Sequence, residues 1–207
     1  MIRPDPRPHR TRNTALAAAR RLLLEEGLEA VTHLRVATAA GLGRKTIYRH
    51  WPTKTELLRD SLSTREWAQV ELSGDLPVDL ARHLEQLRRA LVEGPLARIL
   101  VAILERAAVD PSFLPLHQAL AAEGVRPLTK ILRTGVRSGR LPPDLDLHLA
   151  LGLLEGPLFY RVLVLGERPN SGLIPSLLAA FLAHPPRRPA ARKKIRSARG
   201  SGRRSGS

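Results

Sequence analysis

A run of cationic, hydroxyl and aromatic side chains fills seven consecutive positions in the first quarter of the chain. Residues 44–50 read RKTIYRH, and every side chain in this run except Ile47 can donate a hydrogen bond. Lysine and arginine bind phosphate oxygens, and an arginine can also bridge the O6 and N7 acceptors of a guanine. The chemistry that this run suits is contact with the phosphates and base edges of a nucleic acid.

Helical patterns on either side of a tight turn would position this run. A helix is expected over residues 33–40, because Thr32 can cap it, and a second over residues 44–50, because the residue before Pro52 avoids the α region. Between them the sequence AGLG at 40–43 supplies the turn. A helix, a tight glycine-containing turn and a second helix is a layout that places the second helix in the DNA major groove.

Two further helices are expected to flank this unit. Residues 11–26 carry apolar side chains at helical spacing and end at Gly27, a residue suited to the helix C′ position. Thr53 and Glu56 form a capping box that opens a fourth helix, which the pattern continues to about Ser73. A helix of that length would link the unit mechanically to the rest of the chain.

The side chains expected to contact DNA lie on or beside the second helix of the pair. Arginine and lysine there would read base edges and bind phosphates, and Lys54 adds charge beside the free N–H groups of a helix start. Only some residues of a recognition helix contact DNA, so each one has the alternative of a solvated surface residue. The set is Thr32, Arg44, Lys45, Thr46, Tyr48, Arg49, His50 and Lys54.

The net charge of +15 is concentrated at the two ends of the chain. Residues 1–55 hold eleven Lys or Arg and four acidic residues, and residues 187–207 hold nine Lys or Arg and no acidic residue. The long middle is close to neutral, which favours a nucleic-acid-binding unit joined to a ligand-binding or dimerisation unit. The alternative interpretation of the N-terminal charge is a basic, solubilising surface.

The chain is expected to divide into four parts. Residues 1–10 are rich in Pro and Arg, which predicts a disordered basic arm that either enters a minor groove or is a mobile terminus. Residues 11–58 would form the DNA-binding domain and residues 59–184 an effector-binding and dimerisation domain. Residues 185–207 are dominated by Pro, Arg, Lys, Ser and Gly, which predicts a disordered basic tail that strengthens DNA binding non-specifically.

The part between the basic ends reads as helical throughout, and the chain is expected to be all-α with about nine helices in total. No segment shows the alternating pattern and hairpin turns of β-strands. Residues 99–109 are apolar on nearly all sides, which predicts a central helix of a bundle. A helix over 112–136 is expected to be kinked or interrupted near Gly124 and Pro127. Further helices are expected over 78–92, from Asp144 or Asp146 to about Leu165, and from Asn170 or Ser171 to about His184.

Several function classes lack the residues that they need. The chain has no cysteine, which excludes a thiolate metal site, and its seven histidines show no metal-ligand spacing. It has no nucleophile elbow, phosphate-binding glycine loop or HExxH motif, so no enzymatic activity, metal or cofactor is expected. Glu105 and Glu155 are the candidate buried acids, and pairing with Arg106 or Arg161 would account for them. No apolar run reaches the ~18 residues of a membrane span, and a cytoplasmic protein is expected.

The helix-turn-helix segment and parts of the later helices resemble the tetracycline-repressor (TetR) family of transcriptional regulators. The matched positions of the first part are Gly27, Val36-Ala37, Ala40-Gly41-Leu42, Thr46-Ile47-Tyr48, Trp51, Lys54 and Leu57-Leu58. Later stretches, from Ile131 to Leu141, at Asp144-Leu145-Asp146 and from Gly156 to Arg161, look like one common type of TetR ligand-binding domain. The resemblance covers about residues 11–184.

Three positions depart from the family pattern. Gly43 stands where the family usually has Ser or Thr, whose hydroxyl caps the recognition helix and reaches a phosphate. His50 stands where Tyr is common, and His33 stands where the side chain is usually apolar. The departures leave the expected fold unchanged and bear on individual DNA contacts.

The resemblance implies a homodimer in which the last two helices pack against their twins in a partner chain. Gly152 and Gly156 lie four residues apart on one helix face and would let another backbone approach closely. The alternative for the whole set is an intramolecular core. The expected interface residues are Leu149, Gly152, Leu153, Gly156, Tyr160, Leu177 and Phe181.

The resemblance also implies a small-molecule effector held among the middle helices. With few aromatic residues the pocket is expected to have aliphatic walls, and each of its residues has the alternative of an ordinary core residue. The expected pocket residues are Leu100, Leu104, Phe113, His117, Leu120, Leu158 and Phe159.

These features together predict a TetR-type regulator, a homodimeric repressor released from a pseudo-palindromic operator by a small apolar effector, with the fourth helix transmitting the change. Its expected partners are double-stranded DNA, a second copy of the chain and the effector, with no membrane. The alternative is an architectural or effector-independent DNA-binding protein that uses its basic tail non-specifically. The long apolar middle argues against that alternative, since DNA binding alone does not need it.

Overall fold

The computed structural model describes residues 7–62 and 71–189, and within them the fold is all-α, as expected. A smaller N-terminal unit, here called the head, contains α1 (Arg7–Glu26), η1 (Leu28–Ala30), α2 (His33–Ala40), α3 (Arg44–His50) and α4 (Lys54–Leu62). The larger unit, the body, contains α6 (Leu76–Val92), α7 (Leu96–Val109), η2 (Pro111–Phe113), α8 (Leu114–Gly124), α9 (Arg126–Arg137), α10 (Leu147–Phe159), η3 (Tyr160–Val164) and α11 (Leu173–Ala183).

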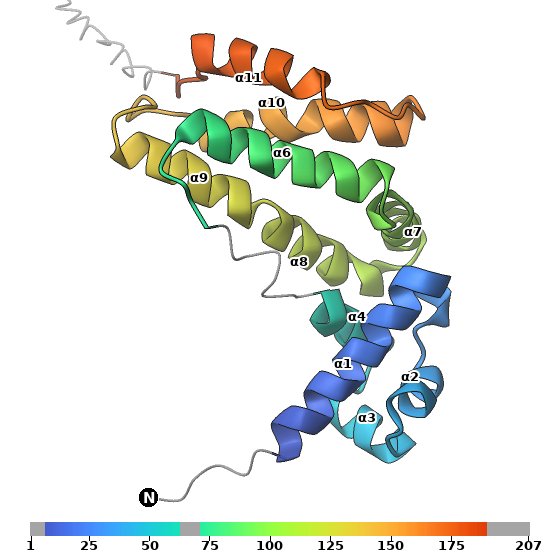
Figure 1. The fold of residues 1–207 in the computed structure, drawn as a ribbon. Coiled ribbons are helices and arrows are strands. Elements are labelled where there is room, and N and C mark those ends of the chain that lie inside the picture. The colour runs from blue at the N-terminus through green and yellow to red at the C-terminus, as the bar shows by residue number, and fades with distance from the viewer. Residues whose placement is uncertain (1–6, 63–70, 190–207) are drawn as a thin grey trace, which may run out of the picture.

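The body is layered, and the head packs against one end of it (Figure 1). Helices α10 and α11 form the outer layer, with α6 and α9 packed against α10 from the other side. Helices α7 and α8 lie between this bundle and the head, where α8 contacts α4. The head is therefore joined to the body by packed helices as well as by the chain that links α4 to α6.

Local sequence signals account for the helix boundaries within the head. The Thr32 hydroxyl accepts a hydrogen bond from the Arg35 N–H at 3.2 Å and caps α2. Gly41 ends α2 with a φ of 64°, a left-handed conformation that is unfavourable for residues with a side chain. Thr53 and Glu56 cap one another reciprocally, both at 3.2 Å, at the start of α4. The expected bounds of α2 and α3 are confirmed.

The outer helices of the head differ from expectation in length. Helix α1 begins at Arg7, within the part expected to be a disordered arm, and stops before Gly27, whose φ is 94°. The described part of α4 runs to Leu62 and residues 71–75 are not helical, so Ser73 is not part of a helix. The Ser73 N–H and hydroxyl both donate to the Asp79 carboxylate, at 2.9 and 2.8 Å, which ties this segment to the start of α6. The rest of that prediction, over 63–70, lies outside the described residues.

Helix α7 was expected at the centre of a bundle, and this expectation is wrong. Ile99 and Ile103 are buried, but Val101 and Leu104 are exposed and Val109 is 75% exposed. Helix α7 packs against the head, α8, α6 and η3, while its apolar face with Val101 and Leu104 is only partly covered by the described residues of this chain. A helix that is apolar on all sides is expected to be buried. The sequence does not show whether the same chain or a second chain covers it.

The apolar interior consists of two clusters, and the boundary between them does not follow the boundary between head and body. The first cluster joins Leu23, Ile47 and Trp51 of the head to Ile103 of α7 and Leu116 of α8. The buried residues of the second come from α6, α9, α10, α11 and the loop between α9 and α10, and Leu100 of α7 packs against them. Helices α7 and α8 thus share a hydrophobic core with the head.

Two other expectations concern the ends of the body. The predicted interruption of the 112–136 helix is confirmed, since α8 ends at Gly124 and α9 begins at Arg126. Residues 185–189 were expected to be disordered, but they pair with the turn before α10. The Asp146 N–H donates to the Pro186 carbonyl and the Arg188 N–H to the Asp144 carbonyl, both at 2.9 Å.

Candidate nucleic-acid interface

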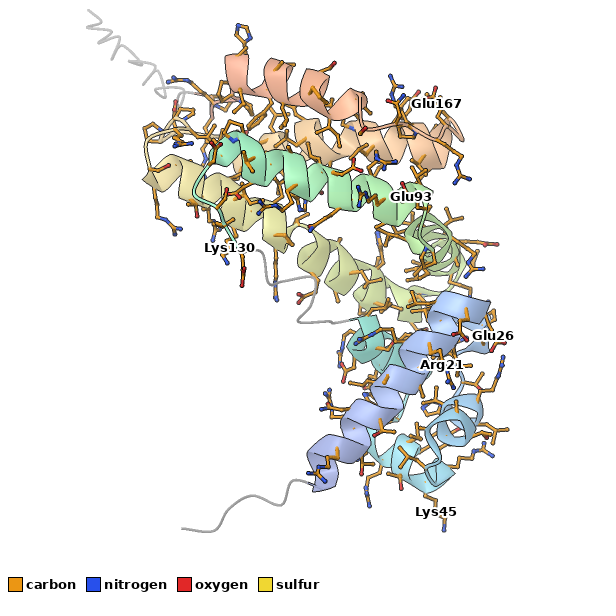
Figure 2. The ribbon with its side chains drawn as sticks, in the orientation of Figure 1. Arg21, Glu26, Lys45, Glu93, Lys130 and Glu167 are labelled. Atoms are coloured by element: carbon orange, nitrogen blue, oxygen red, sulfur yellow. The ribbon has the colours of Figure 1, made fainter. Side chains whose placement is uncertain are left out.

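Helix α3 presents its charged side chains to solvent and its apolar ones to the head core. Arg44, Lys45 and Arg49 are exposed, while Ile47 and Trp51 are buried. Figure 2 shows Lys45 pointing away from the rest of the molecule at the outer end of the head. A short amphipathic helix held in this way from beneath leaves its cationic face free for a phosphate-lined groove.

Tyr48 lies at the centre of a stack that crosses the surface of the head. Its ring is parallel to that of His33 on α2, with centroids 4.1 Å apart and an interplanar angle of 2°. On α3 itself, the Arg44 guanidinium carbon lies 5.4 Å from the Tyr48 ring centroid, and an Arg44 Nη lies 3.5 Å from the Tyr48 hydroxyl. Tyr48 thus contacts a buried histidine of α2 and an exposed arginine of its own helix.

Trp51 connects the end of α3 to three other helices. Its carbonyl accepts a hydrogen bond from His33 Nε2 at 2.7 Å, and its indole N–H donates to the Asp60 carboxylate of α4 at 2.9 Å. Asp60 also pairs with Arg12 of α1, whose guanidinium lies over the Trp51 ring at 5.7 Å from its centroid. The C-terminal end of the recognition helix is fixed from below by this network.

Lys54, at the start of α4, is paired within the chain. Its ammonium donates to the Glu29 carboxylate of η1 at 2.9 Å, and Arg106 of α7 lies 3.9 Å from the other oxygen of Glu29. The hydrogen bond from Lys54 lowers the pKa of Glu29 against the opposing effect of burial. DNA would have to compete with Glu29 for Lys54. Sequence reasoning missed this pair because Glu29 lies outside the helix-turn-helix pattern.

The remaining expected DNA contacts are less exposed than the arginines. Thr46 and His50 are half-buried, and the His50 ring lies against that of Trp51 at 5.4 Å between centroids. The Thr32 hydroxyl is occupied as the cap of α2. Gly43 is the N-cap of α3 and provides no side-chain hydrogen bond there.

The head is also tied to the body by polar contacts. Arg98 of α7 donates to the carbonyl of Leu24 at 2.8 Å, near the end of α1 where helix carbonyls lack partners within the helix. This bond and the shared hydrophobic cluster place α7 in direct contact with the DNA-binding unit. Sequence reasoning had assigned that mechanical role to the fourth helix alone.

The residues expected at a dimer interface lie mainly on the surface of α10. Leu149, Leu153 and Tyr160 are 49%, 46% and 56% exposed. For Gly152 and Gly156, no atom of the described residues lies within 4 Å of where a Cβ would stand. Two members of the set are less accessible, since Leu177 is half-buried and Phe181 is buried in the core of its own chain.

The same surface belongs to the run Leu147–Val164, which has a mean hydropathy of 1.4 and is only 22% buried. By length and composition alone this run is able to cross a membrane, but one such helix is weak evidence of a span. It also carries a buried acid, Glu155. With a proton on Nε2, His83 of α6 donates a hydrogen bond to the Glu155 carboxylate at 2.8 Å. The expected pairing of Glu155 with Arg161 is not found, as Arg161 pairs with Glu167.

The residues expected to line an effector pocket do not gather at one place. Phe113 and Leu120 belong to the cluster shared with the head. Leu100, Leu158 and Phe159 belong to the cluster of the body, while Leu104 is exposed on α7. His117 is half-buried on α8. The pocket thus stays a prediction, and its expected walls belong to two different cores.

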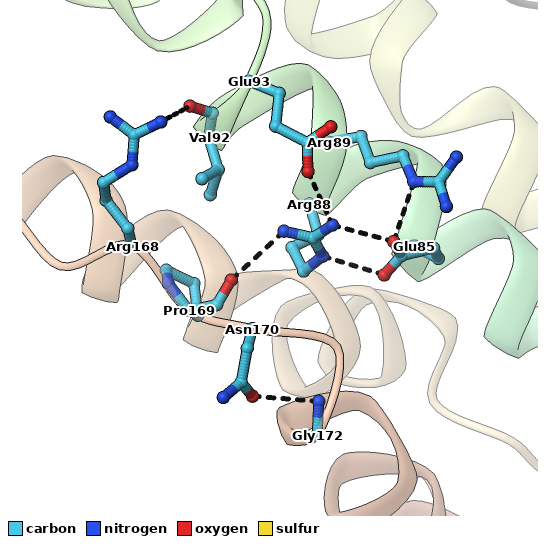
Figure 3. A network of polar contacts seen from close by, with 9 residues as sticks. All are labelled: Glu85, Arg88, Arg89, Val92, Glu93, Arg168, Pro169, Asn170 and Gly172. Atoms are coloured by element: carbon cyan, nitrogen blue, oxygen red, sulfur yellow. Dashed lines mark hydrogen bonds and ion pairs between the residues drawn. The ribbon is translucent and has the colours of Figure 1, made fainter.

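A buried arginine holds the loop between η3 and α11 against α6 (Figure 3). Arg88 donates to Glu85 and to Glu93 at 2.8 Å, and to the Pro169 carbonyl of the loop at 3.3 Å. The hydrogen bonds from Arg88 lower the pKa of Glu85 from its ordinary 4.5 to about 2. Arg168 donates in turn to the Val92 carbonyl at 2.9 Å. Only the local i, i+3 spacing of Glu85 and Arg88 could have signalled this network in the sequence.

Comparison with known proteins shows the family. Residues 15–60 match the family described as bacterial regulatory proteins, tetR family, and residues 70–181 match the tetracyclin repressor-like C-terminal domain. The chain is similar to the uncharacterized helix-turn-helix-type transcriptional regulator YdeS of Bacillus subtilis, with 31% identity over 85% of this chain and 90% of that protein. It is also similar to the DNA-binding transcriptional repressor TetR of Mycobacteroides abscessus, with 29% identity over 73% and 82% of the two chains.

A solved structure agrees with these sequence relatives. The TetR family transcription regulator SCO0332 superimposes with a TM-score of 0.73 at 26% identity, over 84% of this chain and 97% of that one. The match extends over head and body together. With a cationic α3 held on a helix-turn-helix and both family domains matched, the chain belongs to the tetR family of DNA-binding transcriptional regulators.

Proposed function

We propose that the chain is a homodimeric repressor that binds a pseudo-palindromic operator through α3 and is released by a small apolar molecule. The observation that carries DNA recognition is the outward presentation of Arg44, Lys45 and Arg49 on a helix fixed from beneath by Trp51. Arg44 and Arg49 would read base edges, and Tyr48 and Lys54 would contact the backbone.

Dimerisation is proposed through the outer face of α10 and its neighbour α11. Leu149, Leu153 and Tyr160 are apolar or aromatic side chains exposed on one helix, and contiguous apolar surface of this kind is typical of an interface. The open space beside Gly152 and Gly156 supports a close approach of a second α10. A twofold dimer would hold its two reading helices about one DNA turn, ~34–36 Å, or a multiple apart.

The proposed switch is a shift between two dimer states that differ in the spacing of the heads. Helices α7 and α8 are suited to transmit it, because Ile103 and Leu116 share a core with Trp51 and Arg98 bonds to the end of α1. A ligand that moves α7 by a small amount would therefore move the head with it. Such a ligand must bind one of the two states more tightly, since equal affinity shifts nothing.

DNA selection tests the recognition step. Purified chain is incubated with a random duplex pool, bound DNA is enriched over several rounds, and the affinity for the winning sequence is compared with that for a scrambled duplex. The expected result is a two-half-site consensus and a preference of at least about 10³-fold, the lower end for specific regulators. Loss of that preference in Arg49→Ala, with binding to scrambled DNA less affected, would support base reading by α3. No preference for any duplex would overturn the proposal.

One observation favours a second candidate, an effector-independent regulator assisted by the basic tail. Of the expected pocket residues, five are divided between the two hydrophobic clusters and Leu104 is exposed. Two measurements separate the candidates. Release of the selected operator by any member of an apolar ligand panel supports the switch. The alternative is supported if no ligand of the panel changes the affinity for the operator, and if deletion of residues 190–207 lowers the affinity for all DNA sequences alike.

A further inference from the structure

We infer that His33 is a positioning residue for DNA recognition, which orients Tyr48 on the reading surface and holds the carbonyl of Trp51, the residue that follows α3. The inference rests on the proposed binding of DNA by α3. His33 belongs to α2, so it acts on the recognition helix from a neighbouring element. It was noted in the sequence as a departure from the family pattern, and the structure shows where its ring lies.

The contacts of His33 determine both its protonation site and its orientation. The Trp51 carbonyl is an acceptor only, so the Nε2 atom that lies 2.7 Å from it must carry a proton. This carbonyl belongs to the residue after α3, where helix carbonyls need partners from outside the helix. The hydrogen bond fixes the plane of a ring that is 8% exposed.

The ring of Tyr48 takes its orientation from that plane. The two rings are 4.1 Å apart and parallel within 2°, although Tyr48 is an exposed residue that would otherwise sample several rotamers. The Arg44 guanidinium carbon lies 5.4 Å from the Tyr48 centroid, and an Arg44 Nη lies 3.5 Å from the Tyr48 hydroxyl. Tyr48 and Arg44 are therefore ordered before DNA arrives, which lowers the entropy lost on binding.

His33 performs two separable tasks, and a matched pair of substitutions divides them. Phenylalanine keeps a flat ring against Tyr48 and removes the donor to Trp51. Glutamine keeps an N–H donor that reaches the carbonyl and removes the ring. Alanine removes both, and Val78→Ala, at an exposed position on α6 away from the head and from the outer face of α10, is the control for a truncation as such.

The experiment measures the dissociation constant for an operator selected with the unaltered chain, at several salt concentrations, for variants whose circular dichroism and mass match it. We expect His33→Ala to weaken operator binding roughly three- to tenfold, the range of a lost stacked aromatic pair. His33→Phe and His33→Gln should each recover part of the loss, and Val78→Ala should bind normally. If His33→Ala does not fold, the Phe and Gln variants carry the test.

A double substitution separates positioning from a general effect on the fold. In a Tyr48→Ala background, His33→Ala should cause only the smaller loss that belongs to the Trp51 carbonyl, and His33→Gln should cause none, because the stacking part of the effect passes through Tyr48. The salt dependence should stay unchanged, since His33 touches no phosphate. Additive losses, a salt slope that falls by a unit, or His33→Ala binding as tightly as the original would each overturn the inference while DNA binding stands. An unaltered chain without sequence preference would overturn the proposed function itself.

Discussion

The head and the body expose opposite kinds of surface. The head turns cationic side chains such as Arg44, Lys45 and Arg49 outward and keeps Ile47 and Trp51 inside. The body turns leucine, tyrosine and valine outward along α10, η3 and α7. The first surface suits a charged, hydrated partner and the second suits another apolar surface.

Their polar networks differ in the same sense. In the head, Asp60, Trp51 and His33 connect four helices beneath the reading surface. In the body, Arg88 joins its own helix to one loop through Glu85 and the Pro169 carbonyl. The head is thus organised to hold a surface in one shape, and the body to hold a bundle whose outer face exposes apolar side chains.

The largest effect is expected from removing the centre of the head core. Trp51→Ala deletes a fully buried side chain together with its bond to Asp60, and such truncations cost about 3–5 kcal/mol. Operator binding should be lost, while the dimer persists because α10 and α11 belong to the other cluster. Urea unfolding monitored by circular dichroism measures the loss of stability, and light scattering measures whether the dimer persists. A dimer lost together with DNA binding would show that the two regions are not separable.

A charge on the outer face of α10 should have the next largest effect. Leu153→Glu would bury an unpaired carboxylate between two chains, which should weaken the dimer by roughly 100-fold or more. Light scattering against dilution measures the change. The control is Leu34→Glu, which charges a leucine that is 56% exposed on α2 in the head. A normal dimer in Leu153→Glu, or a dissociated one in Leu34→Glu, would contradict the assigned surface.

The Arg88 network predicts a pH dependence of stability. Because the folded-state pKa of Glu85 lies below its ordinary value, its contribution is present above pH 4.5 and is lost as the pH falls toward 2. Glu85→Gln should therefore lower the free energy of unfolding by on the order of 1–2 kcal/mol at pH 7. The difference should shrink at pH 3. Urea titrations at both pH values measure it, and a constant difference would argue against the network as its source.

The smallest effects concern Lys54. Lys54→Ala should weaken binding to all sequences alike and flatten the salt dependence by about one unit of slope. Glu29→Gln removes the carboxylate that holds Lys54 at 2.9 Å, so it should tighten DNA binding by about two- to threefold. Binding measured from low to moderate salt tests both. An unchanged slope in Lys54→Ala would remove this residue from the phosphate contacts.

The parts of the molecule that could be predicted are those with local signals. Thr32, Gly41, Pro52 and the Thr53 capping box each act within four residues, and they place α2, α3 and the start of α4 correctly. The outward side of α3 follows from the same local periodicity.

The parts that could not be predicted depend on contacts between distant residues. His83 and Glu155 are 72 positions apart and Arg98 and Leu24 are 74 apart, so no local pattern connects them. The exposure of Leu104 was missed because an apolar face looks the same whether its cover comes from this chain or from another. The effector site and the dimer stay predictions for the same reason.

The cluster that runs from Trp51 to Leu116 has a consequence for engineering chimeric regulators. A chimera that moves only residues 11–58 onto a foreign scaffold would separate side chains that pack together in this protein. The apolar side chains of the head that contact α7 and α8 would then be exposed to solvent. The transferable module is the four N-terminal helices together with the inward faces of α7 and α8. Chimeric regulators whose junction lies inside that module should misfold. Chimeras that also include the inward faces of α7 and α8 should retain their operator preference.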